Sequence, residues 1–321
     1  MRRFAALGLA ISITTPADAH SRGAPVAAVA PAAIPGEEMI GRWDITVTRG
    51  SRTHPSWLEV KLSGNRTLVG SFVSGGGSAR PVAKVTYAGN GFRFAIPPQW
   101  ERGDGDMVIE GTFANDKLTG TITEPDGSSG SFSAVRAPAL VRRTAPRWGA
   151  PVALFNGRDL AGWRTPDANS KWQVIDGILT NTGSGANLIT TPTYTDFKLH
   201  VEFRVPKNGN SGIYLRGRHE LQVEDSHGME PLSTHTGGVY GFLVPNENAA
   251  RRAGEWQTYD VTLIGRRVTV VLNGRTVIAD QTIPGITGGA LDSNEGEPGP
   301  IYLQGDHTAV EYRKIVLTPV R

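Results

Sequence analysis

The chain has 321 residues, no cysteine and a formal net charge of +3 at pH 7. Without cysteine there can be no disulfide, no thiolate metal site, no cysteine nucleophile and no lipid anchor on an N-terminal cysteine. The basic residues form no clustered stripe, so nucleic acid is not an expected partner. With 40 glycines, 21 prolines and almost no long helical periodicity, the composition favours many short strands joined by turns.

The N-terminus has the three parts of a cleavable export signal. An Arg-Arg pair at 2–3 gives a positive start, residues 4–13 form a short apolar run, and residues 17–19 (Ala-Asp-Ala) supply a small-x-small cleavage pattern. The apolar run is too short to span a bilayer as a helix. We therefore expect residues 1–19 to be a signal peptide cut after Ala19. The mature protein is then expected in the periplasm or secreted, with no integral membrane segment.

Two segments without periodicity separate the expected domains. Residues 20–37 are rich in Ala and Pro and indicate a flexible linker. Residues 138–150 hold prolines and arginines and indicate a second linker. Between them, residues 38–137 contain alternating runs at an even spacing, which predicts a small antiparallel β-barrel or β-sandwich. We find no cluster of His, Asp or Glu there that looks catalytic, so this is expected to be an accessory or substrate-docking domain. Its expected strands are 43–47, 57–62, 67–73, 82–87, 92–96, 107–113 and 117–123.

Residues 151–321 form the second expected domain. Many short strand candidates fit two stacked antiparallel sheets, so we predict an all-β jelly-roll β-sandwich. Asn273-Gly274 between two alternating runs predicts a type I′ hairpin turn. The one expected helical piece is 246–253. The expected strands are 172–175, 177–180, 187–190, 197–205, 211–216, 220–224, 238–243, 257–264, 267–272, 275–278, 301–304 and 310–317.

The most informative stretch runs from residue 210 to residue 228. Because alternate residues of a strand share a face, Glu220, Gln222 and Glu224 line up on one side. Such side chains are costly to bury without partners, so they should face a groove or solvent. Carboxylates and amides suit sugar hydroxyls, and paired carboxylates can act as acid and base. The competing interpretation is an ordinary solvated strand face.

The preceding strand can be set against this one in two ways. A two-residue loop places Leu215 opposite Glu220, whereas a three-residue loop of residues 217–219 places Arg216 opposite Glu220. We prefer the second because it pairs opposite charges and polar with polar groups. The resulting polar face holds Tyr214, Arg216, Glu220, Gln222 and Glu224, with Gly212 leaving a gap over Glu224.

Further polar groups lie near the C-terminus. Gln304, Asp306 and His307 place an amide, a carboxylate and an imidazole at a strand end, and histidine is the usual proton carrier near neutral pH. An ordinary hydrogen-bonded loop histidine is the alternative. The loop 292–297 is acidic and contains glycine, so it could hold calcium through oxygen ligands, although it lacks the spacing of a known calcium loop. No other cofactor is expected. No phosphate-binding loop, HExxH or GxSxG motif occurs.

Six segments of the second domain resemble the 3-keto-disaccharide hydrolase family, over about residues 150–321. LFNGRDLAGW at 154–163 resembles the family's LFNGKDLxGW opening, and NSGIYLR at 210–216 resembles its NSGIFLR strand. ELQVED at 220–225 is similar to its YEVQILD strand, with His219 where Tyr is usual and Glu224 where an apolar residue is usual. The remaining matches are TGGVYG at 236–241, GEWQTY at 254–259 and PIYLQGDH at 300–307.

The resemblance implies a concanavalin A-like, laminarinase-type jelly roll and carbohydrates oxidised at C3 as substrates. A 3-keto group acidifies the C2 proton, so a base can remove it, the C1 substituent can leave by elimination, and water can add back. By motif, Glu220 or His307 is expected to transfer protons and Arg216 to orient or stabilise the ketone oxygen. Asp225 also belongs to the expected catalytic set. The expected substrate-binding residues are Tyr214, Gln222, Glu224, Tyr240, Gln304, Asp306 and Trp163, although Trp163 is equally suited to the core.

The spacing of the carboxylates also bears on the reaction. Glu-x-Gln-x-Glu at 220–224 is similar to the Glu-x-Asp-x-Glu strand of laminarinase-type hydrolases, but Gln222 in the middle weakens their carboxylate relay. Ordinary retaining hydrolysis is therefore not expected. We predict an exported enzyme that cleaves 3-keto-glycosides, and a non-catalytic carbohydrate-binding protein of the same fold is the alternative.

Overall fold

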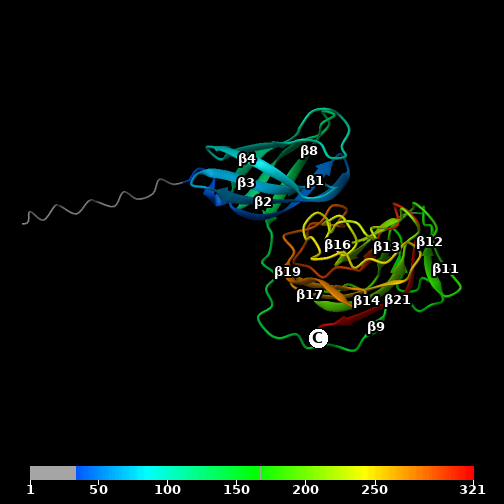
Figure 1. Cartoon of the computed structure of the whole chain (residues 1–321). Coiled ribbons are helices and arrows are strands. Elements are labelled where there is room, and N and C mark those ends of the chain that lie inside the picture. The colour runs from blue at the N-terminus through cyan, green and yellow to red at the C-terminus, as the bar shows by residue number, and fades with distance from the viewer. Residues whose placement is uncertain (1–33, 167) are drawn as a thin grey trace, which may run out of the picture. The chain divides into compact units, whose positions relative to one another are not determined.

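The computed structural model describes residues 34–321 except residue 167. The predicted signal peptide and most of the Ala/Pro-rich linker lie outside these described residues. The described chain has one short 3₁₀ helix near its start, Glu37–Met39, and its other regular elements are all strands joined by turns and loops (Figure 1). The all-β prediction is confirmed. Within this part of the chain, no helix is long and apolar enough to cross a membrane.

The first eight strands form a closed antiparallel barrel, which decides between the barrel and the sandwich expected from the sequence. Each strand pairs with the next, and the last strand pairs back with the first. Side chains that alternate inward fill the barrel, among them Trp43, Phe72 and Phe94. The strands are β1 (Gly41–Arg49), β2 (Arg52–Ser63), β3 (Thr67–Val73), β4 (Arg80–Ala88), β5 (Gly91–Ile96), β6 (Met107–Ala114), β7 (Lys117–Thr123) and β8 (Ser129–Arg136).

The sequence did not predict β8, which closes the barrel. Its inward positions are Gly130, Phe132 and Ala134, so only one large apolar side chain marks the alternation. The rest of the strand is mainly serine. A strand of this composition forms because β1 and β7 offer hydrogen bonds on both sides, rather than because of its own propensity.

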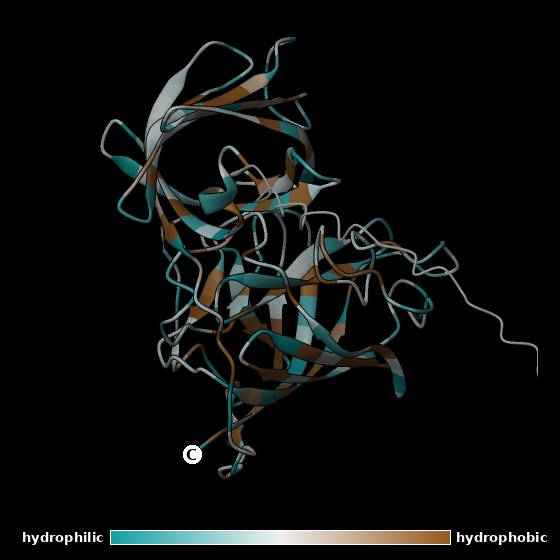
Figure 2. Cartoon of the chain, turned by 90° about the vertical axis from the view of Figure 1, so that its left-hand side faces the viewer, coloured by the Kyte–Doolittle hydropathy of each residue, from teal (hydrophilic) through white to brown (hydrophobic). Residues whose placement is uncertain are grey.

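The remaining strands form two stacked sheets that enclose one apolar core, as the jelly-roll prediction requires. Five strands lie in the order β10-β13-β20-β15-β16, and the other sheet has the order β11-β12-β21-β14-β17-β18-β19, with β9 paired to β21. Apolar and polar residues alternate along many of these strands (Figure 2). The strands are β9 (Val152–Ala153), β10 (Trp163–Arg164), β11 (Trp172–Ile175), β12 (Ile178–Asn181), β13 (Leu188–Thr190), β14 (Phe197–Arg204), β15 (Asn210–Leu215), β16 (His219–Glu224), β17 (Gln257–Ile264), β18 (Arg267–Leu272), β19 (Arg275–Thr282), β20 (Tyr302–Leu303) and β21 (Val310–Pro319).

The sequence predicted the Asn273-Gly274 turn correctly but the helix at 246–253 incorrectly. Asn273 and Gly274 both have positive φ, of 53° and 81°, and join β18 to β19, which confirms the type I′ hairpin. The helix expected at 246–253 is wrong, because this segment is irregular. The side-chain amide of Asn248 donates to the carbonyls of Ser226 and Met229, so polar bonds to a segment distant in sequence hold this stretch in place of helical ones. The strand expected at 238–243 contains only isolated bridges at Val239.

Candidate functional site

A pocket of about 260 Å³ opens over the polar face of β15 and β16, in the five-stranded sheet. It brings together many of the predicted site residues from four separate segments of the chain. Apolar neighbours on the same strands, including Ile213 and Leu221, point into the core on the other side. The pocket is lined by Gly75–Gly77, Asn210, Tyr214, Glu220, Gln222, Tyr240, Gly288, Gly289, Gln304, Asp306 and His307.

The hairpin that carries the pocket has a different register from the one we predicted. Leu215 pairs with His219, so the connection is Arg216-Gly217-Arg218, and Tyr214 rather than Arg216 lies opposite Glu220. Arg216 and Gly217 have φ values of 53° and 65°, and the Arg218 amide donates to the Leu215 carbonyl at 3.1 Å. The turn therefore starts one residue earlier than expected. An arginine at positive φ is uncommon, so its place in the turn was not evident from residue type.

The carboxyl of Glu220 forms the buried floor of the pocket. The residue is only 4% exposed, and the Tyr214 hydroxyl lies 2.9 Å from its Oε2 atom. A Cβ atom at Gly212 would lie 2.2 Å from its Oε1 atom, so the carboxyl leans along the sheet over Gly212. We predicted that Gly212 lies opposite Glu224 and leaves a gap over it. Gly212 instead lies opposite Gln222, and the Glu220 side chain fills the space over the glycine. The absence of a side chain at Gly212 thus gives the Glu220 carboxyl its position.

Hydrogen-bond geometry indicates the protonation state of Glu220. The Tyr214 hydroxyl is 2.9 Å from the Glu220 carboxyl and also 2.9 Å from the Gly288 carbonyl. One phenol proton can serve only one of these acceptors. Both contacts become hydrogen bonds when Glu220 is protonated and donates to Tyr214, which then donates to Gly288. Burial raises the pKa of Glu220 to about 8, against the lowering effect of the Tyr214 hydroxyl and with a smaller contribution from Asp306.

A histidine and a carboxylate lie together at the exposed side of the pocket. His307 Nδ1 is 2.7 Å from Asp306 Oδ1, and both side chains are about half exposed. A hydrogen on Nδ1 completes this bond and leaves Nε2 as the nitrogen that can accept a proton. The hydrogen bond to Asp306 raises the pKa of His307 against the opposing effect of burial. The pocket therefore holds two groups that exchange protons near neutral pH, one buried and one exposed.

Amide and hydroxyl groups line the rest of the pocket. The Gln222 side-chain amide donates to Asn210 Oδ1 at 3.0 Å, whereas the buried Gln222 Oε1 has no hydrogen-bond partner in the described chain. A buried acceptor without a partner is costly, and a ligand hydroxyl can satisfy it. Tyr240 reaches the pocket because its amide donates to the Glu220 carbonyl at 3.0 Å. The sequence reasoning missed Asn210, although it stands two residues before Gly212 and so shares its strand face.

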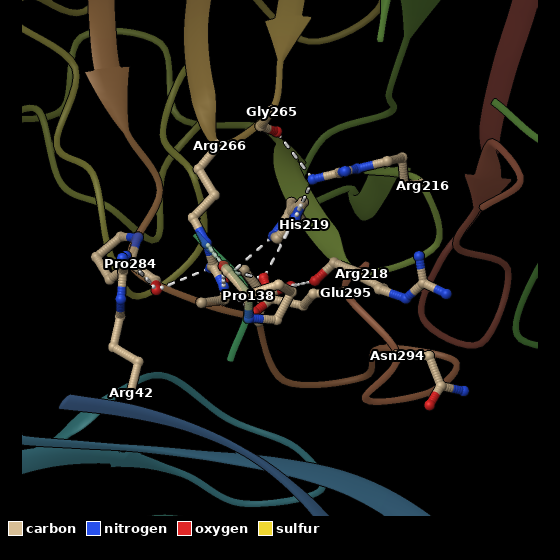
Figure 3. A network of polar contacts seen from close by, with 12 residues as sticks. Arg42, Pro138, Arg216, Arg218, His219, Gly265, Arg266, Pro284, Asn294 and Glu295 are labelled. Carbon is tan, nitrogen blue, oxygen red and sulfur yellow. Dashed lines mark hydrogen bonds and ion pairs between the residues drawn. The ribbon is translucent and has the colours of Figure 1, made fainter. Parts of the chain in front are cut away.

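Arg216 does not lie on the pocket face, so our prediction of its position is wrong. Its Nη2 atom lies 2.9 Å from the Gly265 carbonyl and 3.2 Å from His219 Nε2 (Figure 3). His219 Nδ1 lies 3.1 Å from the Gly285 carbonyl, so Nδ1 carries the hydrogen and Nε2 accepts. Burial and the adjacent arginines hold the pKa of His219 well below its ordinary value. Burial also lowers the pKa of Arg216, to about 10. This arginine is thus part of a buried polar network away from the pocket.

Three other predicted site residues also lie outside the pocket lining. Asp225 follows β16 and accepts a hydrogen bond from the Asn208 amide at 3.0 Å. Glu224 lies opposite Asn210 at the end of the strand, and burial raises its pKa. Trp163 is buried in the sandwich core and donates to the Leu154 carbonyl at 2.7 Å. The family motif at 154–163 therefore has a packing role at its tryptophan.

The acidic loop 292–297 is held by arginines rather than arranged around a cation. Arg218 Nε donates to Asp292 Oδ1 at 2.7 Å, and Arg266 Nη1 donates to Glu295 Oε1 at the same distance. A second contact joins Arg266 Nη2 to Glu295 Oε2. Across residues 34–321 apart from 167, no three His, Asp or Glu side chains are grouped to hold a metal ion. The charges of this loop are used to fix the loop itself.

The comparisons with known proteins concern the sandwich. Residues 150–318 match the family model described as a 3-keto-alpha-glucoside-1,2-lyase-like domain. The 3-keto-disaccharide hydrolase of Bacteroides thetaiotaomicron is 31% identical over 93 residues, which cover 25% of this chain and 32% of that protein. The chain thus spans about a third of the length of this curated relative.

Two solved structures from Parabacteroides distasonis ATCC 8503, both provisionally assigned as glycosyl hydrolases, are also similar. One is 29% identical with a TM-score of 0.47, covering 55% of this chain and 93% of its own. The other is 19% identical with a TM-score of 0.46, covering 53% of this chain and 94% of its own.

Proposed function

Since residues 150–318 match its model, the chain belongs to the 3-keto-alpha-glucoside-1,2-lyase-like domain family, and we propose that it cleaves the glycosidic bond of 3-keto-glycosides and 3-keto-disaccharides. One observation carries this proposal. The pocket joins a buried carboxyl, Glu220, whose pKa is raised to about 8, to an exposed His307–Asp306 pair. Two proton-transfer groups with different environments are what acid–base cleavage requires.

The proposed reaction assigns each group a proton. His307 Nε2 takes the proton from C2, which the 3-keto group acidifies. The electron pair forms a C1–C2 double bond as the bond from C1 to the glycosidic oxygen breaks, and Glu220 protonates that oxygen. Water can then add across the double bond, with hydroxyl to C1 and a proton to C2, so that the net result is hydrolysis. The Tyr240 hydroxyl and the Gln304 amide are the proposed donors to the ketone oxygen, the role first expected for Arg216.

The protonation states favour this assignment over the reverse. The Tyr214 and Gly288 contacts are both satisfied when Glu220 carries a proton, so Glu220 is suited to act as the acid. His307 is exposed, and its Nε2 atom can reach a substrate that enters the pocket. The unsatisfied Gln222 Oε1 atom supports a hydroxyl-rich ligand. These observations support cleavage more specifically than they support binding alone.

Product analysis after incubation with a 3-keto-disaccharide tests the proposal. Glu220→Gln and His307→Ala should each lower the rate at least about 10²-fold if they carry proton transfer. An aryl 3-keto-glucoside with a nitrophenolate leaving group separates the two roles, because a good leaving group needs no acid. It should restore activity to Glu220→Gln and not to His307→Ala. Binding without product, at enzyme concentrations near that of the substrate, would instead favour a non-catalytic carbohydrate-binding protein.

We also propose that the protein is exported and cleaved after Ala19. The support is the order of charged, apolar and small residues at the N-terminus. Fractionation of the producing cells, followed by N-terminal sequencing, should find mature protein that begins at His20 outside the cytoplasm. Full-length protein confined to the cytoplasm would contradict this.

A further inference from the structure

One wall of the catalytic pocket comes from the barrel. Gly75–Gly77, the loop between β3 and β4, lines the pocket together with Gly288 and Gly289 of the sandwich. The Gly289 amide donates to the Gly75 carbonyl at 3.0 Å, and a Cβ atom at Gly288 would lie 2.2 Å from the Gly77 carbonyl oxygen. The two glycine segments are therefore in direct contact. At about 260 Å³, the pocket is smaller than the ~300–1,000 Å³ typical of small-molecule sites. Any saccharide longer than the pocket must continue outside it.

The barrel loop also contacts an exposed tryptophan. Trp100 is 58% exposed, yet Cβ atoms at Gly76 and Gly77 would lie 3.3 Å and 2.7 Å from its indole ring. Its backbone is fixed, because its amide donates to the Glu101 carboxylate at 3.1 Å and that carboxylate pairs with Arg80 at 2.8 Å. An exposed indole on a held backbone is a ready stacking surface for the flat apolar face of a sugar ring.

A second cavity, of about 600 Å³, lies in front of this tryptophan. Gly75 lines both this cavity and the catalytic pocket, so one loop borders the two. Glu124 and Arg49 pair at the cavity, but Glu124 Oε2 and Arg49 Nε are buried without any further partner in the described chain. Glu124 is only 8% exposed, so its free oxygen is costly unless a ligand donates to it.

We propose that this second cavity is a saccharide subsite, with Trp100 as the stacking platform and Glu124 and Arg49 as partners for sugar hydroxyls. The inference rests on the proposed action on carbohydrates. It assigns the barrel a role in binding the part of a neutral oligosaccharide that extends beyond the catalytic pocket. The acidic residues Glu101, Glu124 and Asp126 share the cavity with the arginines, which disfavours an anionic ligand.

Binding of oligosaccharides of increasing length tests this assignment. Glucose and the cello- and malto-oligosaccharides of two to five units would be titrated into the mature chain by calorimetry. In at least one series, affinity should rise at least about fivefold between the disaccharide and the tetrasaccharide, as expected for one stacked ring. Trp100→Ala should remove this gain, Trp100→Phe should retain most of it, and Arg102→Ala, on the exposed edge of the cavity, should reduce it in part. Trp148→Ala, at a tryptophan that lines neither cavity, should leave it unchanged.

Turnover of a 3-keto-disaccharide by the same variants keeps this proposal separate from the proposed function. Trp100→Ala should retain kcat on the disaccharide, because Trp100 does not line the catalytic pocket. Turnover without any length-dependent gain in binding, or a gain that survives Trp100→Ala, would overturn the subsite alone. Length-dependent binding lost in Trp100→Ala, with no turnover in any variant, would sustain the subsite and overturn the proposed reaction.

Discussion

Glu220 and Glu295 are both buried carboxyls near the same hairpin, but their surroundings differ. Glu295 is fully buried and meets Arg266 through both of its oxygens, in the network that also contains Arg216 and His219 (Figure 3). Glu220 has a phenol as its polar partner and faces a pocket. A carboxylate that is paired on both oxygens has its charge compensated and no route to a ligand. A carboxyl with a neutral partner and an open side can change its protonation state in contact with a substrate.

Exchanging each carboxyl for an amide should therefore have opposite consequences, and this is the largest expected effect. Glu295→Gln leaves the buried Arg266 guanidinium without its negatively charged partner, which should lower the free energy of unfolding by about 3–5 kcal/mol. Glu220→Gln replaces a carboxyl that is already largely neutral at pH 7, so stability should change little while the rate falls. Urea unfolding and steady-state kinetics on both variants measure the two effects. Equal losses of stability would show that the two sites are not distinct.

Adding a methyl group beneath Glu220 should sharpen the comparison. In Gly212→Ala, the new Cβ atom would lie 2.2 Å from the Glu220 carboxyl, so that side chain must move. Such overpacking typically costs about 1–3 kcal/mol, and the displaced acid should also lower kcat. Gly105→Ala is the control, since its Cβ atom would approach nothing closer than 3.4 Å. Unchanged kcat in Gly212→Ala would argue that the position of the Glu220 carboxyl is unimportant.

The pH dependence of kcat/KM should show two limbs. His307 must lose its proton to act as the base, and its pKa is raised, so the rate should increase with pH through a value above 6.5. Glu220 must keep its proton to act as the acid, so the rate should fall as pH rises through about 8. With the nitrophenyl substrate, which needs no acid, the alkaline limb should disappear. If the alkaline limb persists with this substrate, it does not report the group that protonates the leaving oxygen, and that acid must be a group other than Glu220.

A separate effect, on the pH dependence of stability, concerns Asp44 of β1, which faces Glu295. Burial raises the pKa of Asp44 to about 9, and the Glu295 carboxylate adds to this while Arg266 opposes it. Because the unfolded pKa is about 3.9, the folded state binds the proton more tightly, and the free energy of unfolding should fall as pH rises from about 4 to 9. Asp44→Asn cannot ionise and should show a shallower fall, measured by urea unfolding across that range. Identical pH slopes for variant and parent would mean that Asp44 does not titrate as stated.

Much of the fold follows from residue patterns of short range. Period-two alternation predicted most strands of both domains, and the Asn273-Gly274 pair predicted its own turn. The pattern failed where local signals were weak, as in the serine-rich β8, or where side-chain bonds replaced a helix, as around Asn248. In both cases the decisive contacts come from segments distant in sequence.

The candidate site was predictable as a set of residues but not as an arrangement. Alternation places Glu220 and Gln222 on one face, whatever the register, because side chains of a strand point to opposite sides in turn. It does not say which turn residue takes positive φ, and a turn that starts at Arg216 moves this arginine from the pocket into a buried polar network.

The sequence by itself therefore determined an all-β chain, a jelly-roll sandwich and a strand face with polar groups, because these depend on residue type and spacing. Only the tertiary structure decided that Glu220 is a buried acid, since its pKa depends on desolvation and on Tyr214 and Gly288 meeting at its carboxyl. The same holds for the barrel loop at the pocket. Contact between residues 75–77 and 288–289 depends on how the barrel packs against the sandwich, and no periodicity of a single strand encodes it.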